Sequence, residues 1–170
     1  VCTNGGSLAS INSTEGVFYA EIAANNNDLT NRVISLSDGS TSNRVSIVLG
    51  TGSNQIRGQV LSGGTSFDFS TTNYDTLNKN KIAISYKLND FKMYINGVEV
   101  ATDTSGNTPI GLNTISFNAG GTSLPFYGKT KALVVYKEAL SDEELTLLTA
   151  PAPVDPVFTL DFDEIANQFT

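Results

Sequence analysis

Ten short runs of alternating apolar and polar residues are the feature that most limits what this chain can fold into. Successive side chains of a β-strand point to opposite faces, so a period of two predicts strands that are buried on one side. The runs cover residues 17–23, 32–36, 44–49, 55–61, 66–69, 81–87, 91–95, 98–101, 114–117 and 131–136. No helical run separates successive strands, which argues against a parallel sheet. About ten strands at this spacing predict an all-β sandwich or barrel.

Two local signals add detail to this fold. Asn96-Gly97 lies between two alternating runs and predicts a type I′ hairpin between residues 91–95 and 98–101. A short helix is expected at residues 142–149, because Ser141 and Glu144 have the spacing of a capping box. About two turns of helix are not stable alone, so Leu145 and Leu148 are expected to dock it on the sandwich.

The length of 170 residues suits one domain with a short extension. We expect the sandwich at residues 1–150 and a proline-rich linker at 151–156. Residues 157–170 alternate again, and they are interpreted either as a further strand of this domain or as the start of a following module.

The charge balance excludes two classes of partner. The net charge of −7 repels phosphate backbones and anionic lipid, so nucleic acid and membrane surfaces are poor candidates. No apolar run is long enough to insert in a membrane. Cys2 is the single cysteine, so no disulfide forms within the chain. We interpret its thiol either as exposed to solvent or as the group that crosslinks this chain to another chain.

Catalytic residues are scarce. The chain has no histidine, which removes the commonest general base and metal ligand. The densest acidic cluster contains Asp161 and Asp163, which would share one face of a predicted strand and could form the carboxylate pair of a glycosidase. The alternative is that they lie at a solvated strand end. We therefore predict that the domain is not an enzyme and assign no catalytic residue.

Metal and sugar ligands are sought in the polar loops. Hard cations take carboxylate and carbonyl oxygens, so Asp28 and Asp38 are the candidate ligands of calcium, with ordinary Asn-rich turns as the alternative. Sugar sites combine aromatic faces with planar hydrogen-bonding groups at a loop-lined rim. The candidate ligand-binding residues are Tyr74, Asp75, Asn118 and Tyr127.

Three blocks of sequence resemble a known family. The hairpin at residues 81–101, the strand at 126–136 and the closing stretch at 137–145 are similar to laminin G-like and pentraxin-like domains. These domains belong to the concanavalin A-like lectin/glucanase superfamily. With the resemblance, we expect an all-β, two-sheet antiparallel jelly-roll sandwich of the concanavalin A-like kind, with about 12–14 strands and one short C-terminal helix. The calcium ligands of the pentraxins have no counterpart in this sequence.

The opening residues 11–21 carry a narrower resemblance, to domains of this family in bacteriophage virion proteins such as tail fibres. Residues 158–163 look like the beginning of a further module in such proteins. The resemblance implies a non-catalytic carbohydrate-binding adhesion module at the virion surface or otherwise outside the cell, whose partner is a glycan on a bacterial surface. One alternative is a structural decoration or assembly module that binds other virion proteins, in which a homo-oligomer is expected. A glycan hydrolase is the minor alternative.

Overall fold

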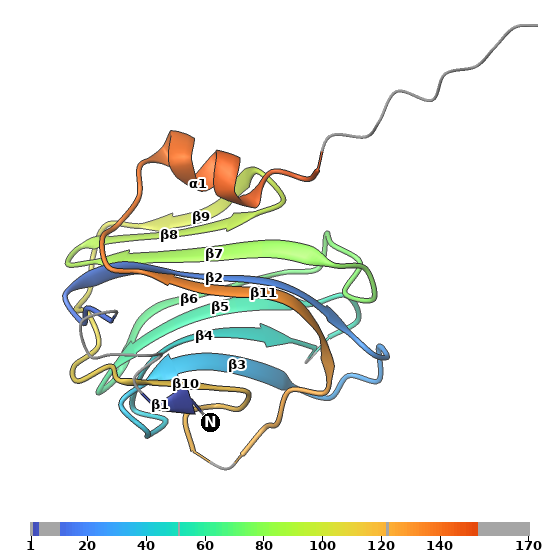
Figure 1. Ribbon diagram of the computed structural model, residues 1–170, viewed down its shortest axis with the longest axis horizontal. Helices are drawn as coiled ribbons and strands as arrows, with labels where there is room; N and C mark the ends of the chain where they lie inside the picture. The colour runs from blue at the N-terminus through green and yellow to red at the C-terminus, as the bar shows by residue number, and fades with distance from the viewer. Residues whose placement is uncertain (1, 4–10, 51, 122, 153–170) are drawn as a thin grey trace, which may run out of the picture.

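The computed structural model describes residues 2–3, 11–50, 52–121 and 123–152, which form eleven strands and one helix (Figure 1). The elements are β1 Cys2–Thr3, β2 Glu15–Ala24, β3 Arg32–Ser37, β4 Asn43–Leu49, β5 Ile56–Ser62, β6 Thr65–Thr71, β7 Asn80–Lys87, β8 Asp90–Ile95, β9 Val98–Asp103, β10 Thr114–Ser116, β11 Gly128–Tyr136 and α1 Asp142–Thr149. All ten predicted strands are present, each with ends within three residues of the prediction. The two-residue β1 was not predicted, and the described part of the chain holds fewer strands than the 12–14 expected.

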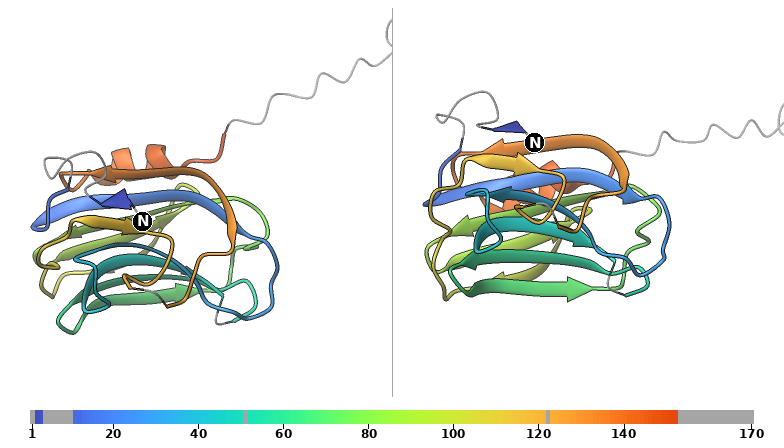
Figure 2. Two further views of the ribbon diagram at one scale, coloured as in Figure 1. Left: turned by 60° about the horizontal axis from the view of Figure 1, so that its bottom comes forward. Right: turned by 90° about the horizontal axis from the view of Figure 1, so that it is seen from below.

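Two antiparallel sheets form the sandwich, and Figure 2 shows them as separate layers. Sheet A has the strand order β1-β10-β3-β4-β5-β6, and sheet B has the order β11-β2-β7-β8-β9. Every neighbouring pair is antiparallel. The all-β two-sheet prediction is therefore confirmed. Cys2, in β1, is paired with Ile115 at the edge of sheet A.

The core lies between the two sheets and follows from the alternation of the strands. Phe18 of β2 and Ile84 of β7 meet Ile34 of β3 and Ile47 of β4, and all four side chains are completely buried. Burial of such side chains stabilises a fold by about 1.5–3 kcal/mol each. The residues between them point to the outer faces of the sheets, so each outer face must be covered separately or exposed to solvent.

The helix α1 covers the outer face of sheet B (Figure 1). Its capping box is confirmed, because the Ser141 side chain accepts from the Glu144 backbone and the Glu144 side chain accepts from the Ser141 backbone. Leu145 is completely buried against Tyr19 and Tyr94, and Leu148 packs beside it, as predicted. The described residues contain no helix that is long and apolar enough to cross a membrane.

The Asn96-Gly97 hairpin is also confirmed. Both residues have positive φ, 51° and 84°, and the flanking Ile95 and Val98 are paired. A type I′ turn needs this left-handed conformation at both central positions. The linker is described only to residue 152, so its remainder, the segment 157–170 and the carboxylates Asp161 and Asp163 lie outside the described residues. The division of the chain into domains stays a prediction.

Candidate functional site

The outer face of sheet A carries an array of polar side chains. Arg44 and Ser46 of β4, Arg57 and Gln59 of β5, and Asp68 of β6 alternate with residues that point into the core. We call these five residues the polar face. Because α1 packs on the other sheet, we take the polar face as the candidate binding surface. Ser46 and Gln59 are buried, so Arg44, Arg57 and Asp68 are the members that a ligand could reach.

Strand register places these side chains side by side. Ser46 pairs with Gln59, and Gln59 pairs with Asp68, so the three form one row across the sheet. Arg44 Nη2 lies 3.5 Å from Gln59 Oε1, and Gln59 Nε2 lies 3.3 Å from Asp68 Oδ2. Arg57 donates from Nε to Asp68 Oδ1 at 2.6 Å and from Nη2 to Asp68 Oδ2. Arg44, Gln59, Asp68 and Arg57 therefore form one hydrogen-bonded chain over three strands, and Ser46 lies beside it without joining it.

The two arginines of this network differ in electrostatic state. The hydrogen bond from Arg57 lowers the pKa of the Asp68 carboxyl, and the same contact raises the pKa of Arg57. Among the residues that the structure describes, no carboxylate forms an ion pair with Arg44. Burial, and to a smaller extent the positive charge of Arg57, lowers the pKa of Arg44. Arg44 is thus a partly desolvated cation whose charge is not neutralised by a neighbour.

The loop between β10 and β11, described at residues 117–121 and 123–127, forms a wall along one side of the polar face. Arg44 Nη1 donates to the carbonyl of Ala119 at 2.9 Å, and Ser35 Oγ donates to the carbonyl of Asn118 at 2.7 Å. Ala119 also packs on Val33 and Val48, which are apolar residues of the same outer face. Beneath this wall, Arg44 Nε and Ser46 Oγ are buried without a hydrogen-bond partner in the described part of the chain. Arg57 and Asp68 stay accessible, with side chains 36% and 28% exposed.

The predicted sugar-binding residues lie around this face, not on it. Asn118 Oδ1 accepts from the backbone of Gly120 and Gly121, so its side-chain oxygen shapes the wall. Tyr127, on the same loop, is 63% exposed. Tyr74 packs against the core. Asp75 accepts hydrogen bonds from Leu77 and Asn78 within its own turn, and the described residues contain no hydrogen bond between Asp75 and Tyr127.

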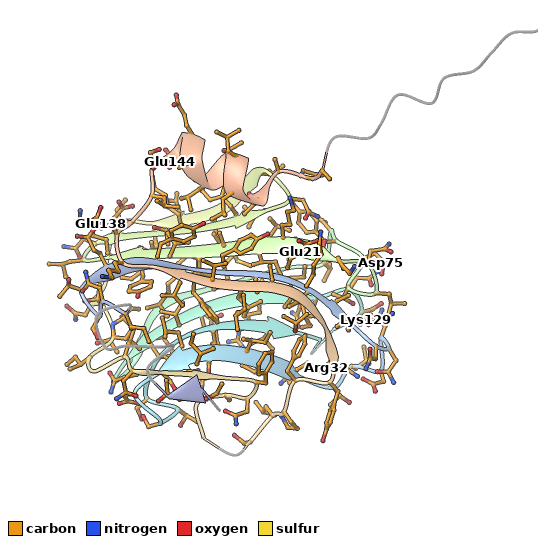
Figure 3. The ribbon with its side chains drawn as sticks, viewed as in Figure 1. Glu21, Arg32, Asp75, Lys129, Glu138 and Glu144 are labelled. Atoms are coloured by element: carbon orange, nitrogen blue, oxygen red, sulfur yellow. The ribbon has the colours of Figure 1, made fainter. Side chains whose placement is uncertain are left out.

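Tyr127 and the Tyr74–Asp75 turn nevertheless approach the same end of the sandwich. Ala24 at the end of β2 pairs with Gly128 on one side and donates to the carbonyl of Thr76 on the other, at 2.8 Å. Figure 3 shows Asp75 and Lys129 at this end. The structure therefore brings three of the four predicted residues to one rim, and their role in binding stays a prediction.

The arginines of the polar face were missed by the sequence analysis. The signal was available, because Arg44 and Arg57 stand at outward positions of alternating strands in a chain with few charges. What the strand pattern alone did not reveal is that register brings these strands together on one face.

The two candidate calcium ligands are engaged in other contacts. Asp28 Oδ1 accepts from Arg32 Nη2 at 2.6 Å. Burial would raise the pKa of Asp38, but hydrogen bonds from Ser40 and Asn43 outweigh it and lower that pKa. Asp28 and Asp38 lie beyond opposite ends of β3, about 17 Å or more apart at the rise of a strand, so they cannot share an ion. Within the described residues, no three acidic or cysteine side chains are grouped to hold a metal.

Comparison with known proteins identifies the family. The family model described as the concanavalin A-like lectin/glucanases superfamily matches residues 7–146. The chain belongs to this superfamily. No curated protein matches it.

Solved structures agree with the superfamily assignment. The CBM40 of the Ruminococcus gnavus IT-sialidase, bound to α2,3-sialyllactose, has a TM-score of 0.65 and 16% identity, over 82% of this chain and 84% of that one. Domain 4 of the extracellular GH43 arabinanase AbnA of Geobacillus stearothermophilus, in complex with arabinotriose, has a TM-score of 0.62 and 20% identity, over 82% and 68%. The NanB sialidase of Streptococcus pneumoniae has a TM-score of 0.65 and 18% identity over 89% of this chain, which spans only 26% of NanB.

At these identities the likeness shows the concanavalin A-like fold alone. The laminin G-like part of the sequence resemblance is confirmed by the family match. The comparisons show no link to bacteriophages, and the virion assignment stays a prediction.

A depression lies on α1, on the opposite side of the sandwich from the polar face. Asp142, Glu143, Thr146 and Leu147 of α1 line a shallow open depression of about 440 Å³. Asp142 is already paired with Lys92. The depression offers carboxylates and one exposed leucine, so it lacks the donors that the polar face provides.

Proposed function

We propose that this domain is a non-catalytic carbohydrate-binding module and that its polar face binds a glycan carrying an acidic sugar. The observation that carries the proposal is the state of Arg44. It is the cation of the polar face that no carboxylate neutralises within the described residues. A ligand carboxylate would supply the missing charge.

The chemistry of a guanidinium suits this role. Arginine has five N–H donors in a planar fork that matches the two oxygens of a carboxylate. Arg44 uses Nη1 on Ala119 and makes only a long contact from Nη2 to Gln59. Partial burial strengthens its attraction for an anion, because the surrounding dielectric is lower than that of water.

The neighbours of Arg44 suit the remainder of a sugar. The guanidinium of Arg57 and the carboxylate of Asp68 stay accessible and offer donors and acceptors to ring hydroxyls on the same face as Arg44. The CBM40 that shares this fold was solved with sialyllactose, an acidic glycan, which supports an acidic ligand as the first class to test. Tyr127, Asp75 and Tyr74 at the rim are proposed as outer contacts for a longer glycan.

The setting of this binding is proposed on sequence grounds. The resemblance of residues 11–21 to virion proteins favours an adhesion module on an exposed surface that recognises host glycan. An extracellular module without a virion would use the same polar face.

A glycan array with acidic and neutral members tests the proposal directly. We expect the native domain to prefer acidic glycans and Arg44→Gln to lose about tenfold or more of that binding, as for a charge-assisted contact. Lys137→Gln is the matched control, because it removes the same charge from an exposed position after β11. Equal binding by Arg44→Gln, or no preference for acidic glycans, would contradict the proposal.

A native domain that binds no glycan would favour the structural alternative. In that case sedimentation should show an obligate oligomer in which the polar face is buried.

A further inference from the structure

The loop between β2 and β3, residues 25–31, gathers three oxygens around one side chain. Asp28 Oδ1 accepts from Arg32 Nη2 at 2.6 Å, and the carbonyl of Thr30 accepts from Arg32 Nη1 at 2.8 Å. Asn26 Oδ1 accepts from the same Nη2. The three acceptors are a carboxylate, a backbone carbonyl and a side-chain amide, at alternate positions 26, 28 and 30 of the loop.

Alternate positions and these oxygen types are also how a loop encloses a hard cation such as calcium. Here the cation at the point of convergence is the guanidinium of Arg32, whose side chain is only 4% exposed. We infer that this guanidinium takes the place of a metal ion and makes the β2–β3 loop independent of calcium.

The fit of a metal ion at this loop fails on electrostatics. A divalent cation near Asp28 would lie against the fixed positive charge of Arg32, at distances where like charges repel strongly in a partly buried site. The hydrogen bond from Arg32 is also the largest cause that lowers the pKa of Asp28. The carboxylate is therefore kept ionised by the guanidinium and is already bound to it.

The organised loop supports the rim on which other predicted residues lie. Asn27 Nδ2 donates to Ser53 Oγ at 3.1 Å and to Asn54 Oδ1 at 3.2 Å, which ties the loop to the β4–β5 connection. Asn54 Oδ1 also accepts from the backbone of Thr76, in the β6–β7 loop that carries Asp75. Figure 3 shows Arg32 and Asp75 at this end of the sandwich.

Gly50 permits the close approach of the neighbouring loop. It has φ of 99°, and a Cβ at this position would lie 2.8 Å from the carbonyl of Thr30 that Arg32 binds. A side chain there would push this acceptor away from the guanidinium. Three loops thus depend on one internal cation, and this inference does not rest on the proposed function.

Thermal unfolding in millimolar CaCl₂ and in EDTA tests the inference. We expect the native domain to have the same Tm in both, and Arg32→Met to lower Tm by about 5 °C or more in either. Arg57→Met is the control, because it removes the arginine of an ion pair that is more exposed. It should lower Tm less than Arg32→Met.

Two results would overturn the inference. One is a native Tm that rises with calcium. The other is an Arg32→Met variant as stable as the native domain. If Arg32→Met does not fold, Asp28→Asn is the second variant to test. The Asp28 side chain is 43% exposed, so we expect the Asp28→Asn variant to fold. The inference is supported if Asp28→Asn has a lower Tm than the native domain and calcium does not change that Tm. It is overturned if calcium raises the Tm of the native domain and Asp28→Asn abolishes this rise.

Discussion

Tyr86 is completely buried, and its hydroxyl donates a hydrogen bond to the backbone carbonyl of Asn12, 2.7 Å away. The side chain of Asn12 in turn donates to the carbonyl of Lys137 at 3.0 Å, so this contact joins the segment before β2 to the end of β11. Tyr86→Phe would leave the Asn12 carbonyl without its buried donor. We expect a loss of about 1–2 kcal/mol in the free energy of unfolding, measured by urea denaturation. Tyr127→Phe, at an exposed ring, should leave it unchanged.

Gly16 lies directly against the same tyrosine. A Cβ at this position would come within 2.5 Å of the carbonyl of Tyr136 and 2.7 Å of the Tyr86 hydroxyl. Because the first of these atoms is backbone, Gly16→Ala is expected to destabilise the domain by about 1–3 kcal/mol. Gly64→Ala, where nothing lies within 4 Å, is the matched control. Equal stability of the two variants would show that β2 and β11 adjust more freely than this packing indicates.

The Arg57–Asp68 ion pair predicts that the free energy of unfolding depends on pH in the acidic range. Its hydrogen bond lowers the pKa of Asp68 in the folded state below the ordinary value of 3.8. The carboxyl therefore contributes stability above its unfolded pKa and loses it as the pH falls through the lower folded pKa. We expect the free energy of unfolding to fall between about pH 5 and pH 2, by less than about 1 kcal/mol for this partly exposed pair. Asp68→Asn should flatten that part of the curve, and an unchanged curve would contradict the assignment.

The capping box of α1 predicts a local effect. Ser141→Ala removes the acceptor for the Glu144 backbone and is expected to cost about 1 kcal/mol. Leu147→Ala, at a side chain 75% exposed on the same helix, should cost little. Amide hydrogen exchange would locate the change, because the first turn of α1 should lose protection in Ser141→Ala and keep it in Leu147→Ala.

Sequence reasoning recovered the features that are encoded locally. The strands follow from alternation, the hairpin from Asn96-Gly97, and the helix from Ser141 and Glu144. Features that depend on long-range pairing were not recovered. Arg44 and Arg57 belong to one face, linked through Gln59 and Asp68, only because β4, β5 and β6 pair in one particular register. Placement of the wall formed by the β10–β11 loop depends on contacts of Asn118 and Ala119 with β3 and β4, which alternation does not encode.

The pairing of β2 with β11 has a consequence for synthesis of the protein. Val17 in β2 pairs with Tyr136 in β11. The early strand β2 therefore has no partner on that side until the last strand, β11, has been synthesised. Sheet A from β3 to β6 consists of successive hairpins and can assemble as it leaves the ribosome. Until Tyr136 has emerged, the β2 edge stays open to strands of other chains, and such open edges promote aggregation. Slow translation of the final third should therefore lower the soluble yield more than slow translation of the hairpins.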